Sequence, residues 1–270
     1  MKQSLFKIGL LVLVVGFFAC KKKHTEPAPD PNKKGSAEVY FDNFVGSQEL
    51  KLNVSYNNPI TGESFTPTLL KYFISNIELK TANGTTFVVP QEQSYFLIDQ
   101  ENPASKKCMI SEIPEGDYSE ITFLVGVDSL RNTKPTSERT GVLDISGAAQ
   151  GMYWSWNSGY IFVKFEGNSP QSAATDKKFR YHIGGFGGYS SPTINCIRKV
   201  TLSFGNDRLK VRQGKTPSLH LIADFLKFFN GNYQLKIANN HTVMFNPLGV
   251  QIANNYQNMF SYDHVHDDGH

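Results

Sequence analysis

Along most of the chain, apolar and polar residues alternate in short segments that Gly, Pro, Asn and Asp separate. The alternation is clear in SAEVYFDNFV (36–45), LLKYFISNIELK (69–80), SEITFLVGV (119–127) and GYIFVKFEG (159–167). Successive side chains of a strand point to opposite faces, so a period of two predicts strands with one buried face. Shorter segments of the same kind are QELKLNVSY (48–56), TTFVVP (85–90), SYFLID (94–99), KFRYHIGG (178–185), CIRKVTLSF (196–204), RLKVR (208–212), SLHLIADF (218–225) and YQLKI (233–237).

The connections between these segments favour an antiparallel arrangement. Gly46-Ser47 joins the first two segments, and Asn83-Gly84 is a strong two-residue hairpin signal. No interval between the strands is long and periodic enough for crossover helices. We therefore expect an all-β fold, a single antiparallel β-sandwich-like domain.

The pattern changes near the end of the chain. PLGVQIANNYQNMF (247–260) places Val250, Ala253, Tyr256 and Phe260 at roughly helical spacing. This predicts a short C-terminal helix packed against the sheet, followed by a histidine-rich tail.

The first residues have the composition of a targeting segment. Lys2 and Lys7 precede the apolar run IGLLVLVVGFFA, which is short for a permanent span and ends at Cys20. With Ala19 before Cys20, residues 1–19 resemble a lipoprotein signal peptide, which implies lipid attachment at Cys20. Lys21 stands where an aspartate would favour inner-membrane retention, so we expect an outer-membrane lipoprotein of a Gram-negative cell envelope.

Residues 20–36 are basic, contain prolines and have almost no large apolar side chains, which predicts a flexible tether. The folded domain is then expected over residues 37–270. The formal net charge of +3 is small and comes largely from the leader and tether. No basic patch with interleaved aromatic residues follows, so the sequence gives no reason to expect a nucleic-acid partner.

The usual catalytic signatures are missing from the sequence. It contains no G-x-S-x-G elbow, no H-E-x-x-H, no Walker loop and no dinucleotide fingerprint. A hydrolase using Asp263, Asp267 and nearby histidines would lack an identifiable general base. We therefore expect a binding protein and not an enzyme.

Histidines offer the best candidate chemistry. His264 and His266 end the chain in SYDHVHDDGH, and in extended backbone both project to one side, where they can share one metal ion; the alternative is a polar tail. His182 stands at the end of a predicted strand beside a glycine turn, as either a ligand or a structural residue. His220 alternates with Leu219 and Leu221, which indicates a solvent-facing strand position, and we do not select it.

Two cysteines remain after Cys20. In an oxidising compartment Cys108 and Cys196 can form a disulfide, and the sequence leaves a disulfide and two free thiols as equal alternatives.

Four segments together resemble the MbnP family of copper proteins over residues 37–268. They are GVDS (126–129), GMYWSWNSGYIFVKFEG (151–167), FRYHIGG (179–185) and ANNYQNMFSYDHVHDD (253–268), and the tryptophan segment is the most specific. The resemblance implies copper binding in the cell envelope. It also implies that a tryptophan, Trp154 or Trp156, is oxidised to kynurenine by a dihaem enzyme of the MbnH type, and that it ligates copper together with histidines.

The resemblance selects His182, His264 and His266 as the histidine ligands. One departure is that no histidine lies between His24 and His182, near the tryptophans. The second hypothesis is an outer-membrane binding or interaction module, in which the tryptophans are core residues or an aromatic platform and no metal is bound.

Overall fold

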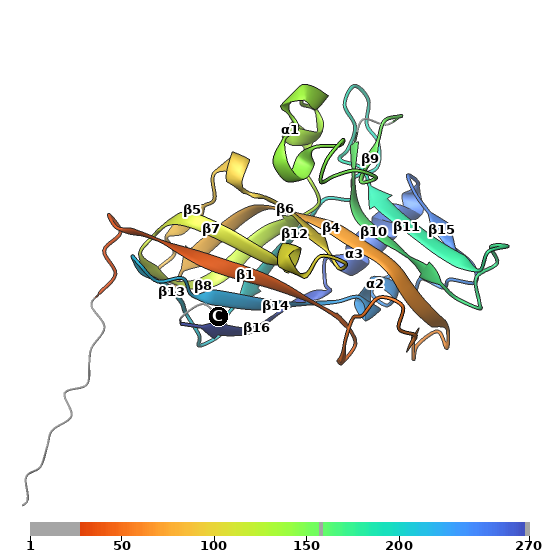
Figure 1. The fold of residues 1–270 in the computed structure, drawn as a ribbon, viewed down its shortest axis with the longest axis horizontal. Helices are drawn as coiled ribbons and strands as arrows, with labels where there is room; N and C mark the ends of the chain where they lie inside the picture. The colour runs from red at the N-terminus through yellow and green to blue at the C-terminus, as the bar shows by residue number, and fades with distance from the viewer. Residues whose placement is uncertain (1–27, 157–158, 268–270) are drawn as a thin grey trace, which may run out of the picture.

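Two β-sheets form the framework of the chain in the computed structural model, which describes residues 28–156 and 159–267 (Figure 1). The smaller sheet has the strand order β16-β14-β1-β2, and β7 also pairs with β1. Its strands are β1 (Lys34–Val45), β2 (Gln48–Glu49), β7 (Lys107–Pro114), β14 (Ser218–Asp224) and β16 (Phe260–His266). This five-stranded sheet carries the candidate site.

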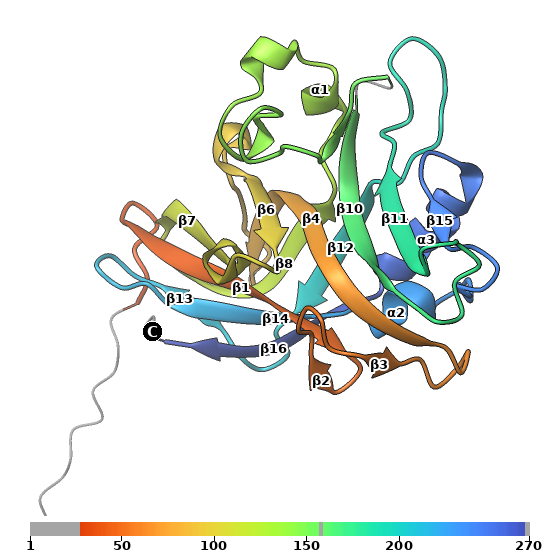
Figure 2. The same ribbon diagram turned by 45° about the vertical axis from the view of Figure 1, so that its right-hand side comes forward.

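The larger sheet has the order β12-β8-β4-β10-β11-β15, with short strands added at its edges and ends (Figure 2). Its strands are β3 (Tyr56–Asn57), β4 (Ser64–Thr81), β5 (Thr86–Val88), β6 (Tyr95–Asp99), β8 (Gly116–Val125), β9 (Tyr153–Trp154), β10 (Gly159–Asn168), β11 (Lys178–Gly184), β12 (Arg198–Ser203), β13 (Leu209–Val211) and β15 (Thr242–Val243). Most pairs in the two sheets are antiparallel, but β1 pairs with β14 and β11 pairs with β15 in parallel.

Helices are few and short in the described residues. The α-helices are α1 (Ser129–Asn132), α2 (Leu226–Phe229) and α3 (Pro247–Tyr256), and 3-10 turns occur at Gln91–Gln93, Pro103–Lys106, Thr136–Glu138 and Gly141–Leu143. The longest helix, α3, confirms the predicted C-terminal helix. Asn246 caps it by accepting a hydrogen bond from the Leu248 N–H, and Pro247 occupies the first turn, where no N–H is needed.

The inner faces of the two sheets meet in an aromatic core. Phe41 of β1 packs edge-on against Phe123 of β8, with ring centroids 5.5 Å apart. Phe260 of β16 completes this contact at 5.1 Å from Phe123. Each fully buried phenylalanine stabilises the fold by about 1.5–3 kcal/mol. The aromatic start of β16 is thus anchored in the core, which fixes the position of the histidines further along that strand.

The predicted all-β, sandwich-like architecture is confirmed, and both predicted hairpins form. Gly46 and Gly84 have φ values of +63° and +92°, a conformation that glycine adopts without strain. Two predicted strands do not form as predicted. The segment 48–56 is in strands only at its ends, in β2 and β3. In residues 233–237, the N–H groups of Tyr233 and Ile237 donate to the side chains of Asn255 and Glu63 instead of to a neighbouring strand.

The structure differs from prediction at both ends of the domain. Strand β1 begins at Lys34, inside the segment predicted as tether, because Gly35 lets the backbone lie against the Arg212 carbonyl, 2.5 Å from where a Cβ would stand. The predicted histidine-rich tail is strand β16 as far as His266. The signal segment 1–19 and Cys20 lie outside the described residues. No helix in the described part of the chain is long and apolar enough to cross a membrane.

The cysteine alternative is resolved in favour of two free thiols. Cys108 lies on β7 opposite Val39, whereas Cys196 lies in a loop against α3 at Gly249. Both are fully buried in these separate places, and each thiol is free. Burial raises the pKa of both thiols, that of Cys196 to about 12, which makes them inert packing residues at neutral pH.

Candidate metal centre

A row of polar side chains crosses the outer face of the five-stranded sheet. The strand register places Lys107 of β7 opposite Tyr40 of β1, Tyr40 beside His220 of β14, and His220 opposite His264 of β16. Residues at one register position on neighbouring strands have side chains about 5 Å apart on the same face. Strand β14 ends at Asp224 and β16 begins at Phe260, so two segments distant in the chain bring their histidines into contact.

A β-bulge at Asp263 sets the direction of the histidines. Tyr262 is opposite the buried Leu221 and His264 is opposite His220, so Asp263 is an extra residue without an opposite partner. In a regular strand Tyr262 and His264 would share one face. The bulge changes the phase, so that His264 and the histidine two residues further on leave the core face and lie beside His220.

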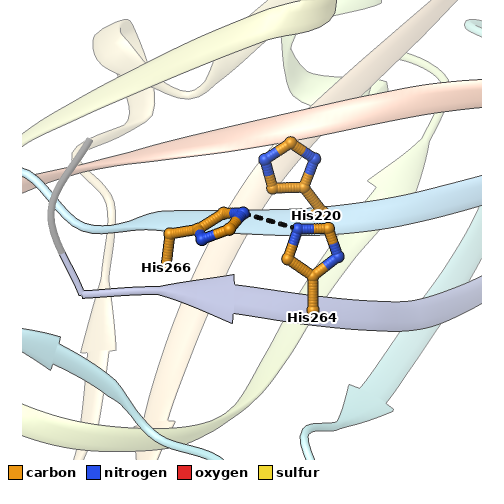
Figure 3. Close-up of side chains that lie close together, drawn as sticks. All are labelled: His220, His264 and His266. Atoms are coloured by element: carbon orange, nitrogen blue, oxygen red, sulfur yellow. Dashed lines mark hydrogen bonds between the residues drawn. The ribbon is translucent and has the colours of Figure 1, made fainter. Parts of the chain in front are cut away.

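Three imidazole rings meet at this point (Figure 3). His220 and His264 stack with ring centroids 4.4 Å apart and planes 8° apart, and His266 stands perpendicular to both. The Nε2 atoms of His264 and His266 are 2.9 Å apart, and one ligand nitrogen from each of the three rings lies within 4.8 Å of the others. Two nitrogens bound at 2.0–2.1 Å to one tetrahedral ion would be about 3.3 Å apart. The nitrogen spacing therefore suits one shared ion, and the stacked rings of His220 and His264 would have to turn for both lone pairs to meet it.

Carboxylates orient two of the three rings. Asp42 Oδ2 lies 3.0 Å from His220 Nδ1, and Asp263 Oδ2 lies 2.9 Å from His264 Nδ1. When Nδ1 donates to a carboxylate, the lone pair of that ring is on Nε2, which is the atom that would bind a metal. Carboxylate–histidine pairs of this kind fix ring orientation and raise ligand basicity in known metal sites.

Tyr40 supports the group from the other side. Its ring stacks on His220 with centroids 4.5 Å apart and planes 4° apart. The Tyr40 hydroxyl donates to Glu38 Oε2 at 2.8 Å, and Lys107 Nζ lies 3.1 Å from Glu38 Oε1 and 5.4 Å from the centre of the Tyr40 ring. His220 is thus held between two flat rings before any ion is bound.

The histidine group is reachable from solvent. The side chain of His264 is 43% exposed, although that of His220 is only 14% exposed. A cavity of about 400 Å³ borders His266, and its other walls include Arg208, Lys210 and Asp267. An ion can therefore enter without rearrangement of the sheet.

His182 lies elsewhere, on β11 of the larger sheet. Its Nε2 is 2.7 Å from Glu166 Oε1, and Lys164 Nζ is 3.7 Å from the same oxygen. The hydrogen bond from His182 holds the pKa of the Glu166 carboxyl below its ordinary value. Of the two alternatives for His182, this placement favours the structural one, a residue of an ion-pair cluster on the outer face of β10 and β11.

Both tryptophans lie on the larger sheet as well. Trp154, on β9, is 6% exposed and closes over Gly184, where a Cβ would be 2.8 Å from the indole. Trp156 is 63% exposed; its ring is 5.5 Å from Trp154 and 5.5 Å from Phe245. Figures 1 and 2 both place β10, the partner of β9, in the sheet opposite β16. The structure therefore corrects the predicted shared site: it does not bring the tryptophans or His182 to the terminal histidines.

His220 is the residue that sequence reasoning missed. Its alternation with Leu219 and Leu221 correctly indicated an outward strand position. What the sequence did not give was the pairing of β14 with β16. The signal that could have identified His220 as a third ligand was its outward position on a predicted strand.

Comparisons with known proteins agree with the fold. A family model described as MbnP matches residues 34–245. MbnP from Methylosinus trichosporium is similar in structure, with a TM-score of 0.54 and 17% sequence identity over 80% of this chain and 83% of that one. A search of curated proteins found no match. The family match includes His220 and ends before β16, so the segment with His264 and His266 lies outside it.

Proposed function

Because the chain belongs to the MbnP family, we propose that it is a copper-binding protein of the cell envelope, with one ion held by three histidines. The observation that carries the proposal is the convergence of His220, His264 and His266 within 4.8 Å. Among the described residues, this is the group of three or more histidine, cysteine or acidic side chains that is spaced for one ion.

The donor set fits copper. Imidazole nitrogen is a good ligand for copper, and at a given nitrogen site Cu(II) binds more tightly than the other divalent first-row ions. The two carboxylates behind the rings, Asp42 and Asp263, offset part of the charge of the ion without occupying a coordination position. Zinc suits the same ligands, so the proposal predicts an order of affinity, copper above zinc.

The hydrogen bond between His264 and His266 determines where the imidazole protons lie before an ion binds. At 2.9 Å, one of the two facing Nε2 atoms of His264 and His266 carries a proton that the other accepts. Both lone pairs must face a bound ion, so binding moves that proton to Nδ1 of its own ring, and an imidazole that is protonated to its cation must first lose a proton. Affinity should therefore fall as the pH is lowered.

We also propose that a tryptophan is oxidised, independently of copper binding by the histidines. Trp156 is the exposed indole of the pair, so it is the one that an MbnH-type dihaem enzyme can approach without unfolding of β9. A kynurenine at this position would lie on the larger sheet, apart from the three histidines. We therefore propose that the histidines bind copper without it. Mass spectrometry of the 151–167 peptide, with and without the oxidising enzyme, tests the assignment of the residue.

Attachment to the outer membrane through Cys20 is likewise proposed, from the leader sequence. Labelling of cells with a fatty-acid probe should mark the wild-type protein and leave the Cys20→Ala variant unmarked and released from the membrane fraction.

The second candidate is an interaction module that binds no metal, and the 63% exposure of Trp156 favours it. In that case copper would leave the protein unchanged, and a ligand stacked on Trp156 would quench its fluorescence.

Titration of the metal-free, unmodified protein separates the two candidates. One equivalent of copper should bind, and His266→Ala should weaken binding by about a hundredfold or more, since removal of a ligand costs more than removal of an outer partner. His182→Ala is the matched control and should bind as the wild type does. Absence of copper binding, or equal affinity in both variants, would remove the metal function from these histidines.

A further inference from the structure

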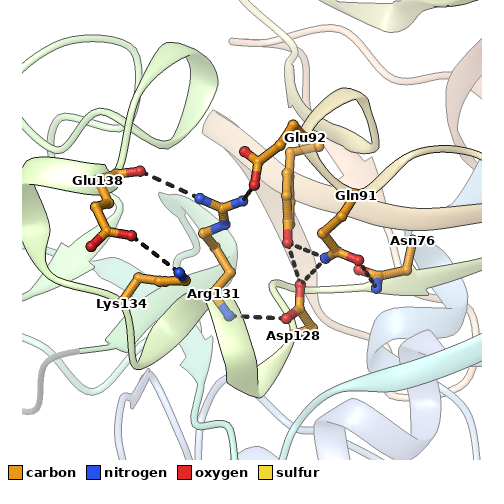
Figure 4. Close-up of polar contacts among 8 residues, drawn as sticks. Asn76, Gln91, Glu92, Asp128, Arg131, Lys134 and Glu138 are labelled. Atoms are coloured by element: carbon orange, nitrogen blue, oxygen red, sulfur yellow. Dashed lines mark hydrogen bonds and ion pairs between the residues drawn. The ribbon is translucent and has the colours of Figure 1, made fainter.

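A second cavity lies far from the histidines, under the segment that carries α1. Figure 4 shows how this segment is held: Arg131 Nη1 donates to the Glu138 carbonyl at 3.3 Å, and its Nη2 pairs with Glu92. Asp128 accepts from the Arg131 N–H at 2.9 Å and from the Tyr95 hydroxyl at 2.5 Å. The segment that carries α1 is thus held in a fixed position on one side of the cavity by buried and charge-assisted hydrogen bonds.

The cavity has a volume of about 340 Å³, with aromatic rings on one side and the polar loop 132–136 on the other. Tyr153, Phe186 and Tyr189 contribute rings, and Thr133 and Pro135 contribute the loop side. The side chain of Tyr189 is 76% exposed, which leaves an aromatic face at the mouth without cover. This volume matches the lower end of small-molecule sites, which combine apolar walls with few polar groups.

The polar lining of this cavity consists of Asn132, Thr133, Lys134, Thr136 and Arg139, and of these Arg139 is a charged residue that is only 5% exposed. Its Nε and Nη2 donate to backbone carbonyls of Asn132 and Lys134 at 2.9–3.1 Å. Among the described residues, Nη1 makes no hydrogen bond of ordinary geometry, although the Tyr160 hydroxyl is close enough to interact with the guanidinium, and no carboxylate lies within ion-pair distance. The rings of Tyr153 and Tyr160 lie 4.8 and 5.3 Å from it.

A buried cation without an anionic partner is rare, because burial of an unpaired charge is costly. Tyr160 does not supply the anion: burial raises the pKa of its hydroxyl to about 12, so it is protonated at neutral pH and donates to the Leu143 carbonyl at 2.6 Å. Arg139 therefore gives the adjoining cavity a positive potential that the protein itself does not neutralise.

We propose that this cavity binds a small monocarboxylate with a flat apolar body. The carboxylate is drawn to Arg139, and the body stacks on Tyr189 and Phe186 at the mouth. The inference does not depend on the histidine group, which lies on the other sheet, and metal binding is expected to leave it unchanged.

Benzoate and benzamide are the probes, since they share a ring and differ in charge. Ligand-observed NMR on the full mature chain should show saturable binding of benzoate and about tenfold weaker binding of benzamide. Tyr189→Ala should weaken benzoate binding severalfold, whereas Ile60→Ala, a change at an exposed apolar residue outside the lining, should not.

Arg139→Gln should abolish the preference for benzoate, with circular dichroism to confirm folding. If that variant does not fold, the comparison of probes and the Tyr189 variant still decide. Absence of saturable benzoate binding, equal affinity for benzamide, or an unchanged affinity in Tyr189→Ala would overturn the proposal.

Discussion

Asp263 and His264 are neighbours in the chain, yet their side chains lie on the same side of β16, with Oδ2 and Nδ1 2.9 Å apart. Adjacent residues of a regular strand point to opposite faces, so this contact exists because Asp263 is the bulged residue. The bulge does two things at once: it turns His264 toward His220, and it places a carboxylate behind it.

Replacement of this carboxylate should weaken the metal site without loss of the fold. In Asp263→Asn the histidine keeps a hydrogen-bonding neighbour but loses the carboxylate that orients its ring, and copper affinity should fall about 10–100-fold. Asp176→Asn, which removes an exposed carboxylate that pairs with Arg180, is the control and should bind as the wild type does. Competitive copper titration measures both; equal affinities would show that Asp263 has no part in binding.

Because Tyr40 stacks on His220, replacements of Tyr40 should lower copper affinity by an amount that depends on whether the flat ring is kept. Tyr40→Phe keeps the flat ring and loses only the hydrogen bond to Glu38, so its copper affinity should stay within about threefold of the wild type. Tyr40→Leu loses the stack and leaves His220 less constrained, so its affinity should fall further. The same titration compares the two variants, and a larger loss in the phenylalanine variant would contradict the stacking argument.

Replacement of Trp154 and replacement of Trp156 should have different effects on the stability of the protein, and neither should change metal binding. Trp154→Ala removes a buried indole against Gly184 and should lower the free energy of unfolding by about 3–5 kcal/mol. Trp156→Ala should change it by no more than about 0.5 kcal/mol, because that ring is exposed. Urea unfolding measures the difference. Any folded variant of either residue should keep the copper affinity of the wild type, and a marked loss would place an indole in the metal site.

The Glu166–His182 pair predicts a pH dependence of stability. The pKa of Glu166 is lowered in the folded state, so the carboxylate stabilises the fold above its unfolded pKa, and this contribution is lost as the pH falls through the lowered folded pKa. Glu166→Gln should destabilise the protein by about 0.2–1 kcal/mol near pH 6 and by almost nothing near pH 2.5. Urea unfolding at the two pH values tests this; a difference that grows toward low pH would have the wrong sign.

Much of the fold could be predicted from the sequence, because strand period and turn residues are local signals. The hairpin at Asn83-Gly84 and the helix from Pro247 follow from such signals. The failed strand at 233–237 shows the limit: side chains distant in sequence, Asn255 and Glu63, take up its backbone donors. A local sequence pattern does not show that distant side chains compete with a neighbouring strand for these backbone N–H groups.

Only part of the candidate site could be predicted from the sequence, because the rest depends on which strands pair with each other. His264 and His266 share a face by their spacing alone, and that much was predicted. The third ligand, His220, depends on which strand pairs with β16, and the phase depends on a bulge. Neither is encoded in the spacing of two histidines. The tryptophans were joined to the site by family resemblance, and the strand pairing of β9 with β10 corrects that assignment.

X-ray absorption at the copper edge, on the unmodified protein loaded with one equivalent, identifies the atoms that bind the ion. We expect scattering from about three imidazole nitrogens near 2.0 Å and no sulfur neighbour. This signal should be lost in the His220→Ala, His264→Ala, His266→Ala triple variant. The same imidazole signal in the triple variant, or a sulfur neighbour in the wild type, would contradict the three-histidine site.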